Sequence, residues 1–316
     1  MQGKIAVVGT IFMDCKGFAD EENGDYNPIG RNTGKVCFVH GGVGRNVAEN
    51  LAGLGHDVRF AASVDQSDIG RAAVQKLKKQ HIDVDFVLKE KNNGMGIWMV
   101  VLNRKGEQVG SLSRMPNVER LERALEEHGK KLFKNVDAVA LEIDLSPGVN
   151  ERTFEWAEKY HKPVYALPAN LNVLLQHPEF LPRLSGFICN QVEIGRLFGF
   201  ASETMEAEEL LETSIRHTKS CGLPLWVITM GDKGAIYYDA GTGEKGYVPA
   251  VKTEVQDVCG AGDSFFSGTL SGILAGKSLR EAVEMGGRLA SLTIQVSENC
   301  FPAIKKYRKF IRRGIQ

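Results

Sequence analysis

The sequence predicts an α/β protein built on a mostly parallel β-sheet with helices on both of its faces. The first observation is that short, mostly apolar runs recur along the chain, such as Ile5–Gly9, Ala138–Glu142 and Leu225–Thr229, as is typical of buried parallel strands. The second is that segments with helical periodicity separate these runs, and the connections between them are short. Ligands of such open sheets bind beside the carboxyl ends of the strands.

The predicted elements follow the chain in this order. Strands are expected at residues 5–9, 35–39, 58–64, 97–102, 107–113, 138–142, 164–167, 187–190 and 225–229. Helices are expected at residues 43–54, 70–80, 150–161, 192–198 and 205–219. Residues 16–34 are polar, rich in Gly and Asn and aperiodic, so no element is expected there. No linker or repeat divides the chain, so a single domain over residues 1–316 is expected.

The composition makes several classes of partner unfavourable. Lys+Arg (39) balances Asp+Glu (39), so no net field attracts nucleic acid or an acidic membrane. The six cysteines show no Cys-x-x-Cys pair or zinc spacing, and Met1 leads directly into a strand, which together predict a cytoplasmic protein with reduced thiols. No segment reaches the roughly 20 apolar residues of a membrane span. The basic segment Lys305–Arg313 is interpreted as a solvated helix, with contact to nucleic acid or acidic lipid as the alternative.

The most informative stretch is Asp257–Ser264, where small residues stand between two carboxylates and a helix follows. Glycine lets backbone N–H groups approach a ligand closely, and a helix N-terminus leaves such groups unpaired and partially positive. We therefore predict an anion hole at Gly260, Ala261 and Gly262. A phosphate there would repel Asp263 unless this residue accepts a proton from the attacking group, so Asp263 is predicted to be a general base. The alternative is a capping aspartate behind a glycine turn.

A second glycine-rich stretch, Gly41–Asn46, opens a helix near the N-terminus. Asn46 and Asn50 lie one helical turn apart on the same face, and Asp14 follows the first strand at the edge where ligands gather. A dinucleotide-binding fingerprint is excluded, because its third glycine is missing and the motif lies about thirty residues beyond the first strand. From the residues alone, a glycine-rich helix start with an exposed Asn46 remains the alternative.

Two shorter motifs follow predicted strands. Asn190 and Glu193 are spaced to hold Mg²⁺ through water, and equally to form a helix capping box. Thr229–Gly234 is a glycine-containing loop that either approaches a phosphate or makes a hairpin turn. Gly276–Ser278 superficially ends a P-loop, but the required earlier glycine is missing and the stretch ends a helix, so Walker-type binding is excluded.

Four of these motifs, taken in chain order, resemble those of the ribokinase-like (PfkB) family of carbohydrate and nucleoside kinases. They are Gly41–Asn46, Asn190–Glu193, Thr229–Gly234 and Asp257–Ser264. Asp257–Asp263 follows the family pattern Asp-Thr-x-Gly-Ala-Gly-Asp, with Val258 in place of Thr. The resemblance covers Gly9 to about Cys300 and implies an ATP-dependent kinase that phosphorylates an alcohol group. It also implies a ribokinase-like fold with a small β-sheet lid, formed by residues 10–40 and 94–115. In the family this lid often serves as the dimer face, so a homodimer through it is one expectation.

The resemblance also implies roles for individual residues, several of which the residues themselves had suggested. The catalytic group comprises Asp263 as base and the backbone of Gly260, Ala261 and Gly262. The sugar-binding group comprises Asp14, Gly41, Gly42 and Asn46. The ATP-binding group comprises Asn190, Thr229, Gly231 and Gly234, with Glu193 and Asn190 holding Mg²⁺ through water. A K⁺ site is implied beside Asp257, with oxygens from backbone carbonyls near this residue and from Ser297–Cys300.

Within the family, residues 32–35, 41–51 and 252–253 look most like those of pseudouridine kinases. The expected reaction is therefore phosphorylation of the 5′-hydroxyl of pseudouridine, with Asn32 or Thr33 accepting the extra N–H of its base. Two departures bear on the substrate: Phe12 stands where the family usually has Asn, and Leu167-Pro168 lacks an acidic residue that many members carry. The alternatives are a kinase for ribose, fructose, a keto-sugar acid or a purine nucleoside, and a non-catalytic binding protein.

Overall fold

The computed structural model describes residues 3–19, 26–103 and 108–313, and within these ranges nine strands form one large sheet. Their order is β13-β12-β11-β10-β9-β8-β1-β4-β5, parallel throughout except for the antiparallel edge made by β12 and β13. The strands are β1 (Lys4–Val8), β4 (Asp57–Asp65), β5 (Val87–Glu90), β8 (Ala138–Glu142), β9 (Val164–Leu167), β10 (Gly186–Asn190), β11 (Leu225–Thr229), β12 (Ala235–Asp239) and β13 (Lys245–Val248).

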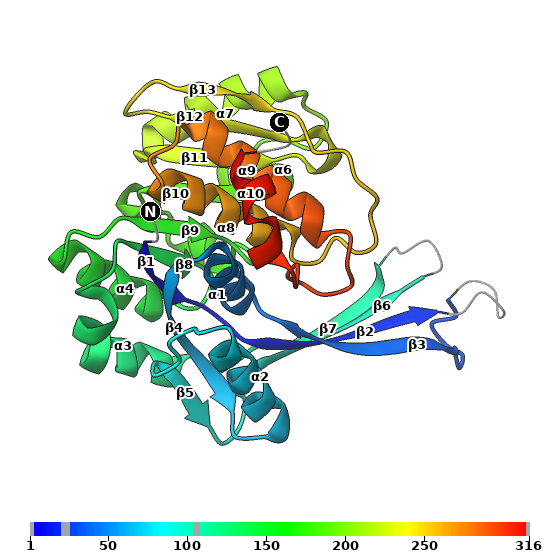
Figure 1. Ribbon diagram of the computed structural model, residues 1–316. Helices are drawn as coiled ribbons and strands as arrows, with labels where there is room; N and C mark the ends of the chain where they lie inside the picture. The colour runs from blue at the N-terminus through cyan, green and yellow to red at the C-terminus, as the bar shows by residue number, and fades with distance from the viewer. Residues whose placement is uncertain (1–2, 20–25, 104–107, 314–316) are drawn as a thin grey trace.

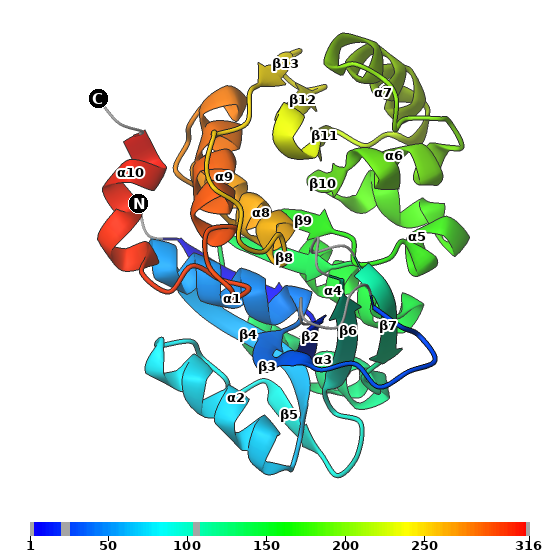
Figure 2. The ribbon, with the colours of Figure 1, turned by 90° about the vertical axis from the view of Figure 1, so that its right-hand side faces the viewer.

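Helices cover both faces of this sheet (Figure 1, Figure 2). One face carries α1 (Val43–Leu54), α2 (Asp68–Lys79), α8 (Ala261–Leu274) and α9 (Leu279–Thr293), with α10 (Ile304–Arg313) packed outside α1 and α9. The other face carries α3 (Glu119–Phe133), α4 (Pro147–Lys159), α5 (Asn172–Gln176), α6 (Gln191–Phe198) and α7 (Ala207–Cys221). Central strands such as β8 are buried along their whole length, which explains why they are apolar rather than alternating.

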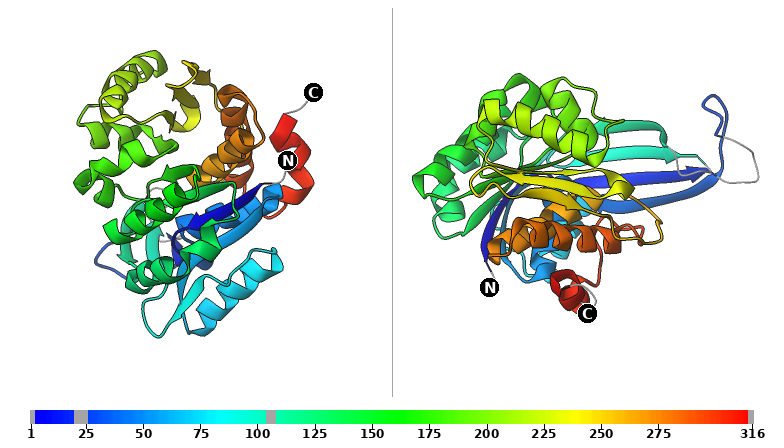
Figure 3. Two further views of the ribbon diagram at one scale, coloured as in Figure 1. Left: turned by 90° about the vertical axis from the view of Figure 1, so that its left-hand side faces the viewer. Right: turned by 90° about the horizontal axis from the view of Figure 1, so that it is seen from above.

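A second, four-stranded sheet projects from the body of the molecule (Figure 1; Figure 3, right). Its order is β3-β2-β6-β7, and its strands are β2 (Phe12–Ala19), β3 (Gly34–Gly41), β6 (Gly96–Leu102) and β7 (Gln108–Arg114). We call this the small sheet. A large, mostly parallel sheet between helices together with a small second sheet confirms the predicted fold class.

The two faces of the small sheet differ in chemistry. Asp14 and Lys16 alternate with solvent-side residues along β2 and are 5% and 1% exposed, so their side of the sheet faces the body of the protein. The opposite side carries one cross-strand row of apolar residues. This row consists of Cys15, Phe38, Met99 and Leu112. Phe38 and Leu112 are 70% and 68% exposed, so the outer face of the small sheet is an exposed apolar surface.

Most predicted elements are present, and three strands match to the residue: β8, β9 and β11. Residues 16–34 were expected to hold no element, but β2 continues to Ala19. The buried side of β2 carries Asp14 and Lys16, so the strand lacks the apolar alternation by which strands are recognised. Among the helices of the described ranges, none combines the length and apolar character that a membrane crossing requires.

Candidate active site

The start of α8 has the geometry of an anion-binding helix N-terminus. Gly260 caps the helix with φ 79°, and a Cβ at this position would overlap the backbone carbonyl of Asn299, so only glycine fits. Ala261 begins the helix, and its N–H bonds to the carbonyl of Val258 at 3.2 Å. The first amides of any helix lack intrahelical acceptors, so the turn presents N–H groups beside Asp263 in the first helical turn.

Asp263 is joined to the second predicted motif by a short hydrogen bond. Asn46 Nδ2 in α1 donates to Asp263 Oδ2 at 2.6 Å. Burial raises the pKa of Asp263 to about 6, and the nearby Asp14 carboxylate adds to this, while the Asn46 bond and the charge of Arg45 oppose it. A carboxyl with this pKa is mostly ionised at neutral pH and still basic enough to accept a proton from an alcohol during its attack. The two predicted motifs therefore meet at one point.

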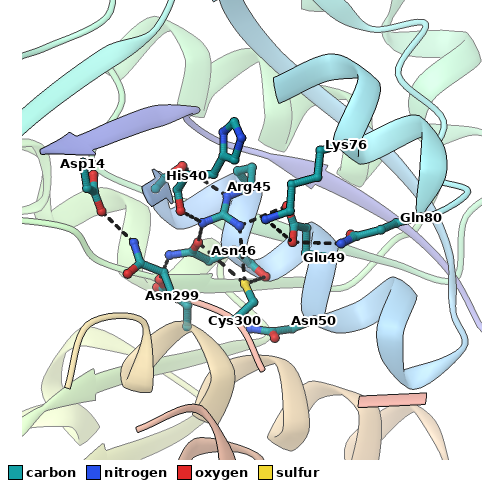
Figure 4. Close-up of polar contacts among 12 residues, drawn as sticks. Asp14, His40, Arg45, Asn46, Glu49, Asn50, Lys76, Gln80, Asn299 and Cys300 are labelled. Atoms are coloured by element: carbon teal, nitrogen blue, oxygen red, sulfur yellow. Dashed lines mark hydrogen bonds and ion pairs between the residues drawn. The ribbon is translucent and has the colours of Figure 1, made fainter. Parts of the chain in front are cut away.

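Arg45 fixes the orientation of the Asn46 side chain. The Arg45 guanidinium is fully buried, pairs with Glu49 at 3.0 Å and donates to the carbonyl oxygen of His40 and to Asn46 Oδ1 (Figure 4). With its oxygen held by Arg45, the Asn46 amide turns its nitrogen toward Asp263. The structure thus explains why a charged residue stands inside the glycine-rich helix start.

The predicted sugar-binding residues lie around the same point. Asp14 Oδ2 accepts a 2.6 Å hydrogen bond from Asn299 Nδ2, which is drawn in Figure 4. A Cβ at Gly41 would overlap the Asp14 carboxylate, and at Gly42, which has φ 96°, a Cβ would overlap the carbonyl oxygen of Thr10. Burial raises the pKa of Asp14, against the lowering effects of Asn299, Lys16 and Arg45. Gly41 is required because the chain passes this close to Asp14, and Gly42 because of its positive φ and the nearby backbone of Thr10.

Glu142, at the end of β8, is a site residue that the sequence analysis missed. It is buried, and its carboxylate accepts from Thr10 N at 2.7 Å, from Thr10 Oγ1 and from Gly44 N at 3.0 Å. Burial raises its pKa to about 7, and the charge of Asp263 adds to this. The signal was available, because an acidic residue that ends an apolar strand lies at the ligand-binding edge of a parallel sheet.

Lys16 and Asn299 complete the network on this side. Lys16 Nζ lies 2.6 Å from Asp257 Oδ2 and donates to Asn299 Oδ1 at 2.9 Å. These two oxygens belong to the region where K⁺ was predicted, and here they accept hydrogen bonds from an ammonium group. The K⁺ site itself stays a prediction.

A cavity of about 610 Å³ lies on the other side of the α8 N-terminus. The predicted ATP residues Thr229, Gly231 and Gly234 border it from the large sheet, and Gly262 borders it from α8. Its remaining wall is largely apolar. That wall includes Val248, Val251, Val255, Val258, Phe265, Ala290 and Ile294. The volume and the apolar lining suit a nucleotide base, and the helix N-terminus beside it suits phosphates.

Asn190 and Glu193 form the capping box that was the structural alternative for this motif. Asn190 Oδ1 accepts from Glu193 N at 2.9 Å, and Glu193 Oε2 accepts from Asn190 N at 2.7 Å. No cluster of three or more His, Cys, Asp or Glu side chains suited to a metal occurs in the part of the chain that the structure describes. Mg²⁺ keeps most of its waters and needs few protein ligands, so a water-held ion at Glu193 is compatible with the capping box and stays a prediction.

Asn32 and Thr33 are the two predicted residues that the structure does not bring to the site. They precede β3, whose other end approaches Asp14, and Thr33 is six residues from Val39, about 20 Å along an extended strand. Both polar ends of the Asn32 side chain bond to the backbone of Asn27. A residue that closes its own turn in this way is not placed to read a substrate at Asp14.

Comparison with solved structures identifies the class of fold. The ribokinase of Arabidopsis thaliana, solved with ribose and ATP, superposes with a TM-score of 0.81 at 20% identity, covering 99% of each chain. A ribokinase from Thermotoga maritima superposes with a TM-score of 0.75 at 19% identity, covering 97% of this chain and 99% of that one. At these identities the likeness establishes a ribokinase-like fold.

The sequence places the chain within a family. It belongs to the pfkB family of carbohydrate kinases, whose model matches residues 2–306. A guanosine-inosine kinase of Exiguobacterium acetylicum is 36% identical over 299 residues, which is 94% of this chain and 96% of the relative. The pseudouridine kinase of Escherichia coli is 25% identical over 294 residues, 92% and 90% of the two chains. The protein is therefore an ATP-dependent phosphotransferase that acts on a hydroxyl group.

Proposed function

We propose that the protein transfers the γ-phosphoryl group of ATP to the 5′-hydroxyl of a ribonucleoside, and that inosine and guanosine are its preferred acceptors. The observation that carries this proposal is the 36% identity, over nearly the whole length of both chains, with a guanosine-inosine kinase. The pseudouridine kinase is 25% identical over a similar length. Pseudouridine is therefore the second candidate, supported by the motif likeness noted from the sequence.

Trp98 supports a nucleoside over a free sugar. It stands directly opposite Asp14 in the register of β2 and β6, so its side chain lies on the face of the small sheet that is turned toward the site. Its indole ring is partly exposed and, within the described ranges, makes no hydrogen bond or ring contact. A nucleobase stacked on a tryptophan gains about 1–3 kcal/mol. A ribose held by Asp14 would carry its base within reach of this ring.

The chemistry follows from the residues around α8. Asp14, Asn46 and Glu142 hold the ribose hydroxyls, with Gly41 and Gly42 allowing the close approach of the sugar to the backbone. Asp263 accepts the proton of the attacking 5′-hydroxyl. The amides of Gly260 and Gly262 stabilise charge on the transferring group, and the amide of Ala261 joins them once it releases the carbonyl of Val258. Phosphoryl transfer requires little covalent work from a protein, so positioning and electrostatic stabilisation supply most of the rate.

On the nucleotide side, the apolar cavity receives the adenine, and the loop with Thr229, Gly231 and Gly234 approaches the phosphates. Asn190 and Glu193 would hold Mg²⁺ through its waters, and the ion would neutralise phosphate charge. The whole chain acts as one domain, with the small sheet covering the acceptor. The exposed row containing Phe38 and Leu112 is the surface through which two copies would pair, because burying such a row removes apolar area from water.

The proposal is tested by kcat/KM for inosine, guanosine, pseudouridine, uridine, ribose and fructose with ATP, each measured separately. Purine nucleosides are expected to lead. Trp98→Ala should lower kcat/KM for nucleosides by about tenfold, as expected from lost base stacking, and leave ribose unchanged. Val101→Ala, on the outer side of the same strand and outside the apolar row, is the control. A preference for ribose or fructose, or equal losses with ribose and inosine in Trp98→Ala, would contradict the nucleoside assignment.

A further inference from the structure

Lys16 is a charged residue at a buried position, where an unpaired charge destabilises the fold. It belongs to the small sheet, yet its side chain is 1% exposed. Taking an ammonium out of water costs several kcal/mol unless it is paired with good geometry. Lys16 Nζ has such partners: Asp257 Oδ2 at 2.6 Å and Asn299 Oδ1 at 2.9 Å. A buried lysine that joins parts of the chain 241 residues apart indicates a role beyond solubility.

Both members of the pair are charged. Burial alone would lower the pKa of Lys16, but the hydrogen bond and charge of Asp257 outweigh it and the pKa is raised. Burial alone would likewise raise the pKa of Asp257, but the hydrogen bonds from Lys16 and Cys259, together with the Lys16 charge, outweigh it and the pKa is lowered. The contact is therefore an ammonium–carboxylate pair at neutral pH.

This pair supports the loop that shapes the anion hole. Asp257 Oδ1 accepts from Cys259 N at 2.9 Å, and Asp257 N bonds to the carbonyl of Ile294 at 3.2 Å. Gly260 then packs directly against the carbonyl of Asn299. The backbone that leads into the first turn of α8 is thus fixed from both sides, by Asp257 and by Asn299, and Lys16 bonds to both.

The same pair is linked to the acceptor site. Asn299 uses its oxygen for Lys16 and its nitrogen for Asp14, so Asp257, Lys16, Asn299 and Asp14 form one continuous chain of hydrogen bonds. Asp14 and Lys16 are two residues apart in β2 and point to the same side. Strand β2 therefore carries both Asp14, which is predicted to bind the sugar, and the Lys16 ammonium that bonds to the anion-hole loop.

We propose that the Lys16 ammonium is a built-in cation that positions the anion-hole loop, so that the enzyme does not require K⁺. The sequence predicted K⁺ on backbone carbonyls near Asp257 and on oxygens of residues 297–300. The Lys16 ammonium lies in this region, bonded to the Asp257 carboxylate and to the Asn299 amide oxygen. A second cation held by carbonyls next to this buried ammonium would be strongly repelled by it, because like charges a few ångströms apart repel strongly in a buried site. Lys16 acts through the loop and is a positioning residue. The inference rests on the kinase activity but not on which acceptor is used.

The first measurement compares wild-type rates in K⁺ and in tetramethylammonium at equal ionic strength, using whichever acceptor the protein phosphorylates best. The two rates should agree within about twofold. A loss of tenfold or more without K⁺ overturns the proposal. Because any phosphorylated acceptor serves, a failed nucleoside assignment leaves this test intact.

The second measurement uses Lys16→Met, with Lys35→Met in the exposed strand β3 as the matched control. Lys16→Met should lose about 10–10² in kcat, as expected from a loosened anion hole, with a smaller change in KM for ATP. Ammonium or K⁺ should restore several-fold of that rate, and neither ion should affect Lys35→Met. An unchanged kcat, or a loss that no small cation relieves in a folded variant, contradicts the proposal.

A third variant controls for loss of activity through misfolding, because removing only one member of a buried ion pair leaves the other charge unpaired. The double variant Lys16→Met/Asp257→Asn removes both charges. It should keep a cooperative thermal transition and ATP binding, show the same low kcat, and no longer respond to K⁺ because the carboxylate is gone. Wild-type activity in this folded double variant would show that the pair does not position the loop.

Discussion

The acceptor side and the nucleotide side of the candidate active site are built by different means. On the acceptor side, buried polar side chains bond to one another and to backbone, as Asp14 does with Asn299 and Glu142 with Thr10. On the nucleotide side, a cavity of about 610 Å³ is lined mainly by glycines and apolar side chains. A pattern of hydroxyl groups can be selected only by fixed polar partners, because a missing hydroxyl then leaves a buried group unpaired. ATP needs mainly a flat apolar slot and backbone N–H groups.

The largest effect is expected where the two sides meet, at Asp263. Asp263→Asn keeps an oxygen that can accept from Asn46 Nδ2, so the fold and acceptor binding should persist. The kcat should fall by about 10²–10⁴, the usual contribution of a positioned general base. Steady-state rates together with calorimetric binding of the acceptor test this. Activity within a few-fold of wild type would remove Asp263 from the role of base.

The next effect concerns the acceptor side alone. Asp14→Asn keeps an acceptor for Asn299 but loses the charge that strengthens hydrogen bonds to substrate hydroxyls. We expect kcat/KM for the acceptor to fall by about 10–10², with KM for ATP little changed. Kinetics with each substrate varied in turn separate the effect on the acceptor from the effect on ATP. A matching rise in KM for ATP would show that the two sides are not independent.

A smaller effect is expected from a matched change on the nucleotide side. A Cβ at Gly262 meets nothing within 4 Å, so Gly262→Ala should fold normally and place its methyl toward the phosphates. The KM for ATP should rise by about tenfold, equivalent to one or two weakened N–H contacts. Gly110→Ala in β7, where a Cβ is equally free, is the control. If KM for the acceptor rises instead, the cavity has been assigned to the wrong substrate.

The smallest effect is a pH dependence. The raised pKa of Asp263, about 6, means that the base is protonated and inactive below this pH. The kcat/KM should therefore be about half-maximal near pH 6 and fall tenfold per unit below it. Glu142 also has a raised pKa, about 7, so the profile of Glu142→Gln should be measured in parallel. The limb near pH 6 should remain in this variant; its disappearance would assign the titration to Glu142.

The sequence predicted what depends on local chemistry and missed what depends on burial. Gly41, Gly42 and Gly260 were identifiable because a glycine-rich helix start is typical of a place where backbone approaches a ligand or another segment closely. Lys16 was not identifiable, because a lysine in a polar segment normally indicates a solvent-exposed position. Its partners, Asp257 and Asn299, are also distant in the chain. Asn32 and Thr33 were chosen because they precede the expected strand at residues 35–39, but β3 is eight residues long and carries them away from Asp14.

The central claim is that this kinase selects a ribonucleoside, and one competition measures it directly. Inosine, guanosine, pseudouridine, ribose and fructose are mixed at equal concentration with limiting ATP, and the phosphorylated products are quantified by mass spectrometry. Product ratios under these conditions equal ratios of kcat/KM. We predict that inosine and guanosine 5′-phosphates dominate and that pseudouridine 5′-phosphate follows. Ribose or fructose phosphate as the main product would contradict the claim.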